Sequence, residues 1–226
     1  SPARPFWPGA ALLTALIMVC CAGLLLGRLL FSYVALERIK RRARPVAAVI
    51  SGVETRFRKA TLAESSEVAS PVLAGLWRPA VLLPTGFIDR YPEGEVRPAI
   101  LHERAHLVRW DDWTQLAQRL LDAVLFFHPG VRGLTWGMEL DRELACDVAV
   151  LARTGDPQSY CQCLARLVGV AEPSTAPVLL TGRGRTIVKR METIMNLQKT
   201  GGSGRAFVPF AALAMVGVLL AAIGPI

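Results

Sequence analysis

Leu101-His102-Glu103-Arg104-Ala105-His106 is the stretch that decides how the rest of the chain is interpreted. Residues four apart share one face of a helix, so His102 and His106 can direct two imidazoles at one metal ion. Glu103 can accept a proton from an attacking water and return it to a leaving amine. This spacing is typical of zinc peptidases. It predicts a helix over residues 93–110, a Zn²⁺ cofactor and a catalytic Glu103.

A catalytic zinc ion needs a third protein ligand and an open coordination position. His128, the remaining histidine of the chain, lies in Phe126-Phe-His-Pro-Gly130 and suits a turn or a helix end better than a ligand. Glu143 and Asp147 stand four apart on a helix predicted over residues 131–153. Glu143 could complete the site, and Asp147 could hold a ligand histidine through its ring N–H. The alternative for both acids is a solvated charged face.

Two apolar segments are long enough to cross a bilayer. Residues 5–27 and 206–226 carry no charged side chain, and we predict transmembrane helices over 10–34 and 206–226. About 20 apolar residues, at about 1.5 Å per residue, cross a hydrocarbon core of about 30 Å. The alternatives are buried core helices and, for the first segment, a signal peptide.

The net charge of +8 is concentrated beside these two segments. Residues 28–44 and 183–205 each carry six basic groups against one acidic group. Basic groups flank spans on the cytoplasmic side of bacterial-type inner membranes. We therefore expect an extracytoplasmic end at 1–9, a basic cytoplasmic linker at 35–45 and a cytoplasmic domain at 46–200. The lipid bilayer is an expected partner, and direct binding of nucleic acid is not expected.

The remaining pattern predicts a small β-sheet followed by helices. Val-rich and Ile-rich residues 46–58 favour a strand, and polar residues 60–68 favour a loop or a short turn. Residues 71–84 predict a hairpin whose second half, Ala80, Val81, Leu82 and Leu83, is an edge strand. Further helices are expected over 113–127, 157–170 and 186–198. Asp111 and Asp112 are expected to cap the first of these.

Four blocks of sequence carry a family resemblance. They are residues 70–84, the stretch from His102 to Asp111, residues 126–129 and residues 142–147. In order and spacing they resemble the membrane-embedded metallopeptidases of the BlaR/MecR antibiotic-sensor type. The resemblance implies Glu143 as the third zinc ligand, Glu103 as the general base, Asp147 as a supporting acid and Asp111 as a structural acid.

The resemblance also implies a fold and a function. We expect an α+β membrane protein: a mainly helical, zincin-like (gluzincin) domain with a small β-sheet, flanked by two transmembrane helices. It would hydrolyse a peptide bond of a cytoplasmic repressor, or of the chain itself, in transmembrane signalling. The strand 80–83 could pair with an extended substrate, and a homo-oligomer is left open.

Two other interpretations fit the same motif. One is a membrane zinc protease of the prenyl-protein-processing or heat-shock type. The other is a signalling scaffold whose zinc site is not catalytic.

Overall fold

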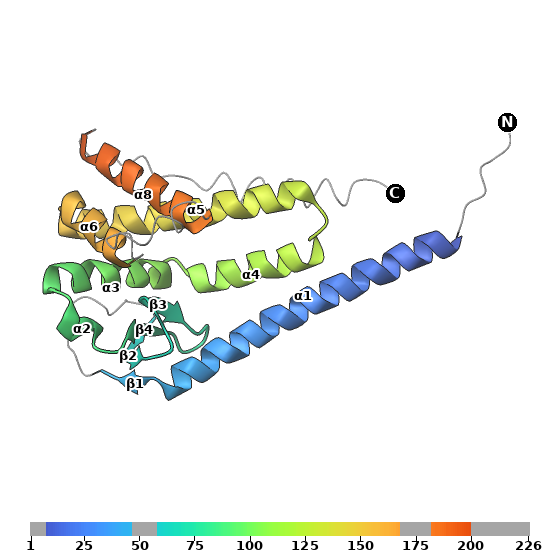
Figure 1. Ribbon diagram of the computed structural model, residues 1–226, viewed down its shortest axis with the longest axis horizontal. Coiled ribbons are helices and arrows are strands. Elements are labelled where there is room, and N and C mark those ends of the chain that lie inside the picture. The colour runs from blue at the N-terminus through green and yellow to red at the C-terminus, as the bar shows by residue number, and fades with distance from the viewer. Residues whose placement is uncertain (1–7, 47–57, 168–181, 200–226) are drawn as a thin grey trace.

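A long N-terminal helix extends from a domain built of a small sheet and six further helices in the part of the chain that is described. The computed structural model describes residues 8–46, 58–167 and 182–199 (Figure 1). Helix α1 (Pro8–Arg42) contains the predicted span 10–34, and its most apolar window is 0% buried. It is the single helix within the described residues that is long and apolar enough to cross a membrane. The predicted span 206–226 lies outside these residues.

Helix α1 continues well beyond the predicted span, through most of residues 35–45. Glu37 forms ion pairs with Lys40 and Arg41, three and four residues later, and such pairs suit a helix. The helix therefore passes without a break from its apolar half into its basic half. Strand β1 (Arg44–Pro45) follows, and most of the predicted strand 46–58 lies outside the described residues.

The sheet has four strands in the order β1-β2-β4-β3. Strands β3 (Val72–Ala74) and β4 (Ala80–Pro84) form the predicted antiparallel hairpin. Strand β2 (Thr61–Ser65) runs parallel to β4, so the prediction of a loop over 60–68 is wrong. The inward residues of β2 are Ala63 and Ser65, which are too small and too polar to reveal a strand in the sequence.

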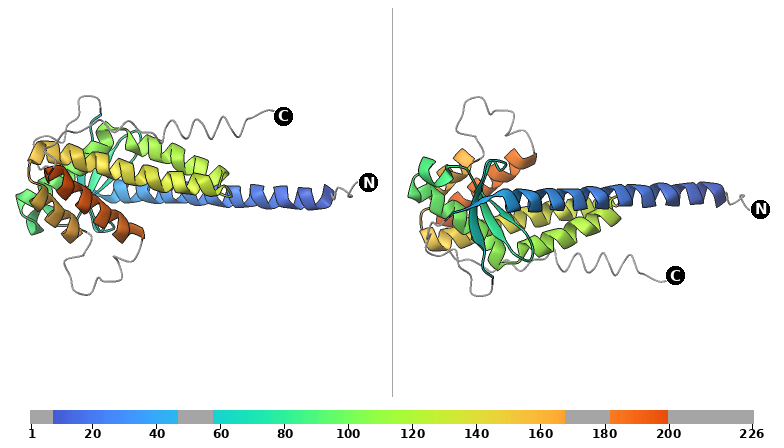
Figure 2. Two further views of the ribbon diagram at one scale, coloured as in Figure 1. Left: turned by 90° about the horizontal axis from the view of Figure 1, so that it is seen from above. Right: turned by 90° about the horizontal axis from the view of Figure 1, so that it is seen from below.

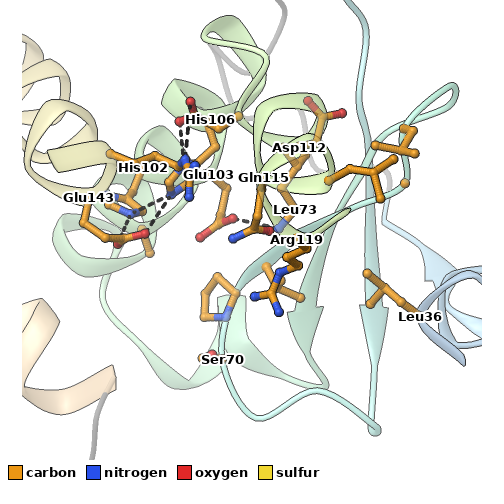
Figure 3. A pocket seen from close by; sticks show the side chains of 18 of the residues that line it. Leu36, Ser70, Leu73, His102, Glu103, His106, Asp112, Gln115, Arg119 and Glu143 are labelled. Atoms are coloured by element: carbon orange, nitrogen blue, oxygen red, sulfur yellow. Dashed lines mark hydrogen bonds and ion pairs between the residues drawn. The ribbon is translucent and has the colours of Figure 1, made fainter. Parts of the chain in front are cut away.

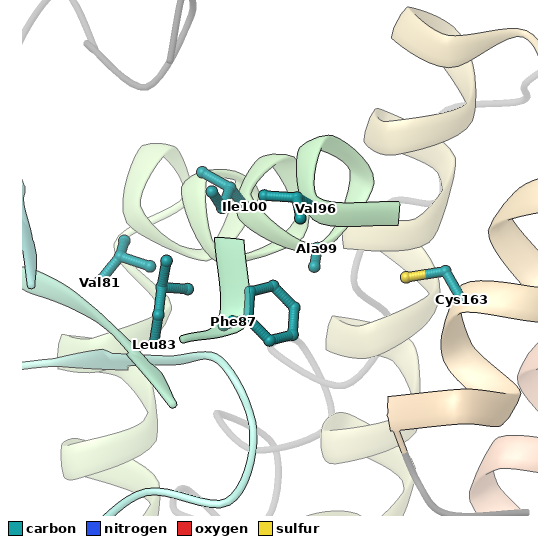
Figure 4. Close-up of a cluster of buried hydrophobic side chains, with 7 residues drawn as sticks. All are labelled: Val81, Leu83, Phe87, Val96, Ala99, Ile100 and Cys163. Carbon is teal, nitrogen blue, oxygen red and sulfur yellow. The ribbon is translucent and has the colours of Figure 1, made fainter. Parts of the chain in front are cut away.

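The prediction that Ala80–Leu83 is an edge strand is also wrong, because β4 lies between β2 and β3. All four of these residues are buried. Val81 and Leu83 pack against Phe87 and helix α3 (Glu93–Val108) on one face (Figure 4). Leu82 packs on the other face, in a cluster that includes residues of α1. The free edge nearest the remaining helices belongs to β3.

Helix α3 (Glu93–Val108) is the centre of the domain. The sheet contacts one side of it, and α5 (Pro129–Thr154) and α6 (Pro157–Leu167) contact the other. Helix α2 (Phe87–Arg90) precedes it, α4 (Asp111–Val124) follows it, and α8 (Gly182–Lys199) closes the helical side. A second core joins α3, α5, α6 and α8 through Leu101, Val150, Leu164 and Ile194. These helices confirm the predicted ones, with α8 beginning four residues early.

A strained turn joins α3 to α4. Trp110 has a positive φ of 59°, and it takes the N-cap position expected for the aspartates. Asp112 lies instead in the first turn of α4 and accepts two hydrogen bonds from Arg58, at 2.6 and 2.9 Å. Arg58 also donates to the Leu76 carbonyl and lies 4.3 Å from the Trp110 ring centroid. These contacts fix where Asp111 enters the domain.

The interior position of β4 makes a prediction about stability. Leu82→Ala should lower the free energy of unfolding by about 2–5 kcal/mol, because it removes a fully buried side chain between the sheet and α1. Its neighbour across the ladder, Val72, is only half-buried on the edge strand, so Val72→Ala should cost clearly less. Chemical unfolding of the detergent-solubilised chain measures both. Equal losses would argue against the interior position of β4.

Candidate metal centre

Three potential metal ligands converge from two helices. His102 and His106 lie one turn apart on α3, and Glu143 faces them from α5 (Figure 3). The two Nε2 atoms are 3.2 Å apart. Glu143 places Oε2 3.3 Å from Nε2 of His102 and Oε1 3.6 Å from Nε2 of His106. The structure thus brings together the residues that the sequence predicted as ligands.

The spacing of these atoms fits a small tetrahedral cation. Two ligand atoms at about 2.05 Å from a tetrahedral zinc ion stand about 3.3 Å apart. The three separations between His102, His106 and Glu143 lie close to that value. The donor set, two imidazole nitrogens and one carboxylate, is also one that zinc accepts.

The other ring nitrogen of His102 is held by a buried chain of hydrogen bonds. The Tyr160 hydroxyl lies 2.9 Å from Nδ1 of His102 and donates to Asp147 Oδ1 at 2.7 Å. Because the hydroxyl has one proton, His102 donates its Nδ1–H to Tyr160. Arg190 of α8 donates twice to Asp147 and also pairs with Glu143 at 2.8 Å. The predicted supporting acid Asp147 therefore acts on His102 through Tyr160 and also directly, since its Oδ1 lies 3.3 Å from Nδ1 of His102.

His106 is oriented in the same way by the predicted structural acid. Its Nδ1 lies 2.9 Å from Asp111 Oδ2 and 3.3 Å from the Cys146 sulfur. These three residues form a second group that could hold a metal ion. Burial and the nearby Asp111 raise the pKa of Cys146, so the side chain stays a thiol. A metal ion bound there would have to displace the thiol proton, and Cys146 is fully buried, whereas Glu143 borders the cavity, so access favours the group containing Glu143.

Together these contacts leave two lone pairs facing each other. When both histidines are neutral, each carries its proton on Nδ1, and each Nε2 presents a lone pair to the other at 3.2 Å. A proton or a cation between them removes this repulsion. The buried carboxylates behind the rings favour positive charge at the same place. The residues present therefore fit a divalent metal ion.

The protonation states of the site follow from burial and charge. Burial disfavours a charge on His102, but hydrogen bonds with Asp147 and Glu143 outweigh it and raise the pKa to about 9. Burial raises the pKa of Glu143, but the hydrogen bond with His102 and the charge of Arg190 lower it to about 2. Burial also raises the pKa of Glu103. Without metal, His102 is thus a cation beside an ionised Glu143.

Glu103 lies beside the ligands and faces the sheet. Its Oε2 accepts a hydrogen bond of 2.7 Å from the backbone N–H of Leu73 on β3. Glu103, both histidines and Glu143 line a cavity of about 640 Å³. Residues of α1, including Tyr33 and Leu36, form another part of its wall. The general base predicted from the sequence therefore sits between the candidate metal ligands and an open space.

Sequence reasoning missed several contributors to this site. Tyr160 and Arg190 carry no metal-binding signature, and they reach His102 and Asp147 across 58 and 43 residues of chain. Leu73 contributes only its backbone. His128 is exposed at the N-cap of α5, which confirms its helix-end role.

The raised pKa of His102 predicts how metal affinity depends on pH. A cation must displace the proton that His102 retains up to about pH 9 in the metal-free site. Zinc affinity should keep rising by about tenfold per pH unit above pH 6.5, rather than levelling off at the ordinary histidine pKa. Competition with a chelating dye between pH 6.5 and 8.5 measures this slope. A flat affinity across that range would contradict the assigned contacts.

Comparison with known proteins identifies a relative and a family. Regulatory protein BlaR1 of Bacillus licheniformis is 26% identical over 175 residues. The alignment covers 74% of this chain and 29% of that protein, so the chain spans less than a third of its relative. The likeness and the apolar helix α1 indicate a membrane protein. Residues 4–194 match the family described as BlaR1 peptidase M56, and the chain belongs to that family.

Proposed function

We propose that the chain is a membrane-anchored zinc endopeptidase, with His102, His106 and Glu143 as the zinc ligands and Glu103 as the general base. The convergence of the three ligand groups, with Glu103 beside them on the cavity wall, carries the proposal. A structural zinc ion is normally enclosed by four protein ligands. Three ligands that border an open cavity suit a catalytic ion better, and this favours an enzyme over a zinc-containing scaffold.

The side chains divide the chemistry between them. A zinc ion held by His102, His106 and Glu143 would supply Lewis-acid chemistry, by polarising the scissile carbonyl and lowering the pKa of the attacking water toward about 7. Glu103 takes the proton of that water and delivers it to the leaving amine. Burial of Glu103 raises its pKa, which makes the carboxylate a stronger base for the proton of that water. The hydrogen bond from the Leu73 N–H orients the Glu103 carboxylate before substrate binds.

We propose that the substrate pairs with β3 rather than with the buried strand β4. The Leu73 N–H points away from β4, because it donates to Glu103. In an antiparallel pair the carbonyl of the same residue points the same way. An extended peptide added along this edge would lie next to Glu103 and the zinc ligands. Strand addition would therefore present a scissile bond to the site.

We place the peptidase domain on the cytoplasmic face of a bacterial-type inner membrane, because the basic groups follow the apolar half of α1. Its proposed substrates are a cytoplasmic transcriptional repressor or the chain itself, cleaved during signalling. The relative's description as a regulatory protein supports a signalling role.

The Glu103→Gln variant tests the assignment of the base. It should lower the rate of peptide hydrolysis by about 10²–10⁴-fold, because it removes proton transfer. It should still bind one zinc ion, because the three ligands are unchanged. The full chain in membranes, loaded with zinc, is incubated with a bacterial cytoplasmic extract, and new peptide N-termini are identified by mass spectrometry. Metal content is measured on the same samples.

Glu139→Gln is the matched control, because Glu139 is an exposed acid on α5 outside the site. It should produce the same new N-termini as the unmodified chain. Undiminished cleavage by the zinc-loaded Glu103→Gln variant would refute Glu103 as the base. The absence of cleavage by every zinc-loaded form would favour the scaffold interpretation.

A further inference from the structure

We infer that the tip of the α4–α5 hairpin, residues 120–138, inserts into the same bilayer as α1, so that its partner is lipid. The inference rests on the proposed placement of α1 in the membrane. The hairpin projects from the domain in the same direction as the apolar half of α1, as both views of Figure 2 show. Helix α4 contacts α1 directly.

The position of the hairpin along α1 sets its depth. Cys21, Ala22, Leu25 and Leu26 are partly covered, whereas residues 9–20 are exposed all around. The covered positions are three to four apart, so they form one face of α1. They lie on the apolar side of Arg28, the first charged residue of the helix. Cys21 is about 10 Å beyond Arg28, at about 1.5 Å per residue. A segment that covers this face of α1 therefore lies at the depth of the hydrocarbon core.

The outer surface of the tip is apolar. Leu120, Val124, Phe127 and Trp136 are 43%, 53%, 53% and 52% exposed. Residues 120, 124 and 127 follow helical spacing along one side of α4 and into the turn. Large side chains grouped in this way mark a protein or membrane contact. Within residues 120–138 the charged side chains are Asp122 and Arg132.

Polar side chains at the base of the hairpin are hydrogen-bonded within the domain, whereas His128 and Arg132 near the turn are exposed. Thr135 donates to Asp122 at 2.5 Å, and Gln118 donates to the Thr135 carbonyl and accepts from Arg142. The turn is closed by backbone hydrogen bonds from Leu125 to Leu121, from His128 to Leu125 and from Val131 to His128. A segment in hydrocarbon must satisfy its backbone polar groups, and these bonds satisfy part of the turn.

The base of the tip carries the residues expected at a membrane surface. Lys189 of α8 lies 5.5 Å from the Trp136 ring centroid, and Arg119 is exposed on α4. Tryptophan and basic side chains are enriched where hydrocarbon meets headgroups. A second copy of the chain could also cover the apolar tip. Continuity with the bare apolar surface of α1 favours lipid.

Photo-crosslinking tests this placement. Phe127 is replaced by p-benzoyl-phenylalanine, which keeps an aromatic ring at an exposed site. The full chain is reconstituted in vesicles of phosphatidylcholine and phosphatidylglycerol, irradiated and analysed by mass spectrometry. Leu16, exposed on the apolar half of α1, is the positive control. Val148, an exposed apolar residue at the domain end of α5, is the matched negative control.

Phospholipid adducts at Phe127 should be about as abundant as at Leu16 and severalfold more abundant than at Val148. Adducts with a second copy or with another part of the chain, or a lipid yield no higher than at Val148, would overturn the inference. Lipid adducts at Leu16 but not at Phe127 would overturn the insertion of the hairpin and leave the placement of α1 unaffected. Their absence at both positions would also reject the placement of α1 on which the proposed function depends.

Discussion

The hydrogen bond at Nδ1 of each histidine is the constraint on which the site depends. It fixes the tautomer and the ring orientation, so that both Nε2 atoms point at the same place. Helical spacing alone puts His102 and His106 on one face, but it does not set the direction of either ring. His102 needs Tyr160 from α6, which is held by Asp147 of α5, and His106 needs Asp111 from α4. Four helices must therefore pack correctly before a metal ion can bind.

This arrangement buries several charges, and they compensate one another. Asp147 is 1% exposed and accepts hydrogen bonds from both Arg190 and Tyr160. An unpaired carboxylate there would be strongly destabilising, whereas a paired one is rigid. Arg190 also pairs with Glu143. Helix α8 therefore connects Glu143, the third candidate ligand, to Asp147, which supports His102. The sheet contributes on the opposite side, where β3 holds Glu103 against the cavity. The pre-set geometry suits catalysis by charge stabilisation.

The sequence predicted the elements that local pattern determines. The His-x-x-x-His spacing, the acidic start of α3 and the break at His128-Pro129 place the helices with small errors. Glu143 was chosen through a family resemblance, since 41 residues separate it from His102 and no local rule joins them. Strand β2 was missed because its buried residues are small, and β4 was placed at an edge because its partner β2 was missed. Long-range partners such as Arg190 depend on tertiary packing that a single sequence does not reveal.

The proposed function requires that His102, His106 and Glu143 hold the metal, rather than His106, Asp111 and Cys146. X-ray absorption at the zinc edge of the purified, zinc-loaded chain distinguishes these two sets of ligands. We predict one zinc ion per chain, with nitrogen and oxygen ligands at about 2.0–2.1 Å, two imidazoles and no sulfur. A sulfur ligand at about 2.3 Å would identify Cys146 as a ligand and contradict the central claim.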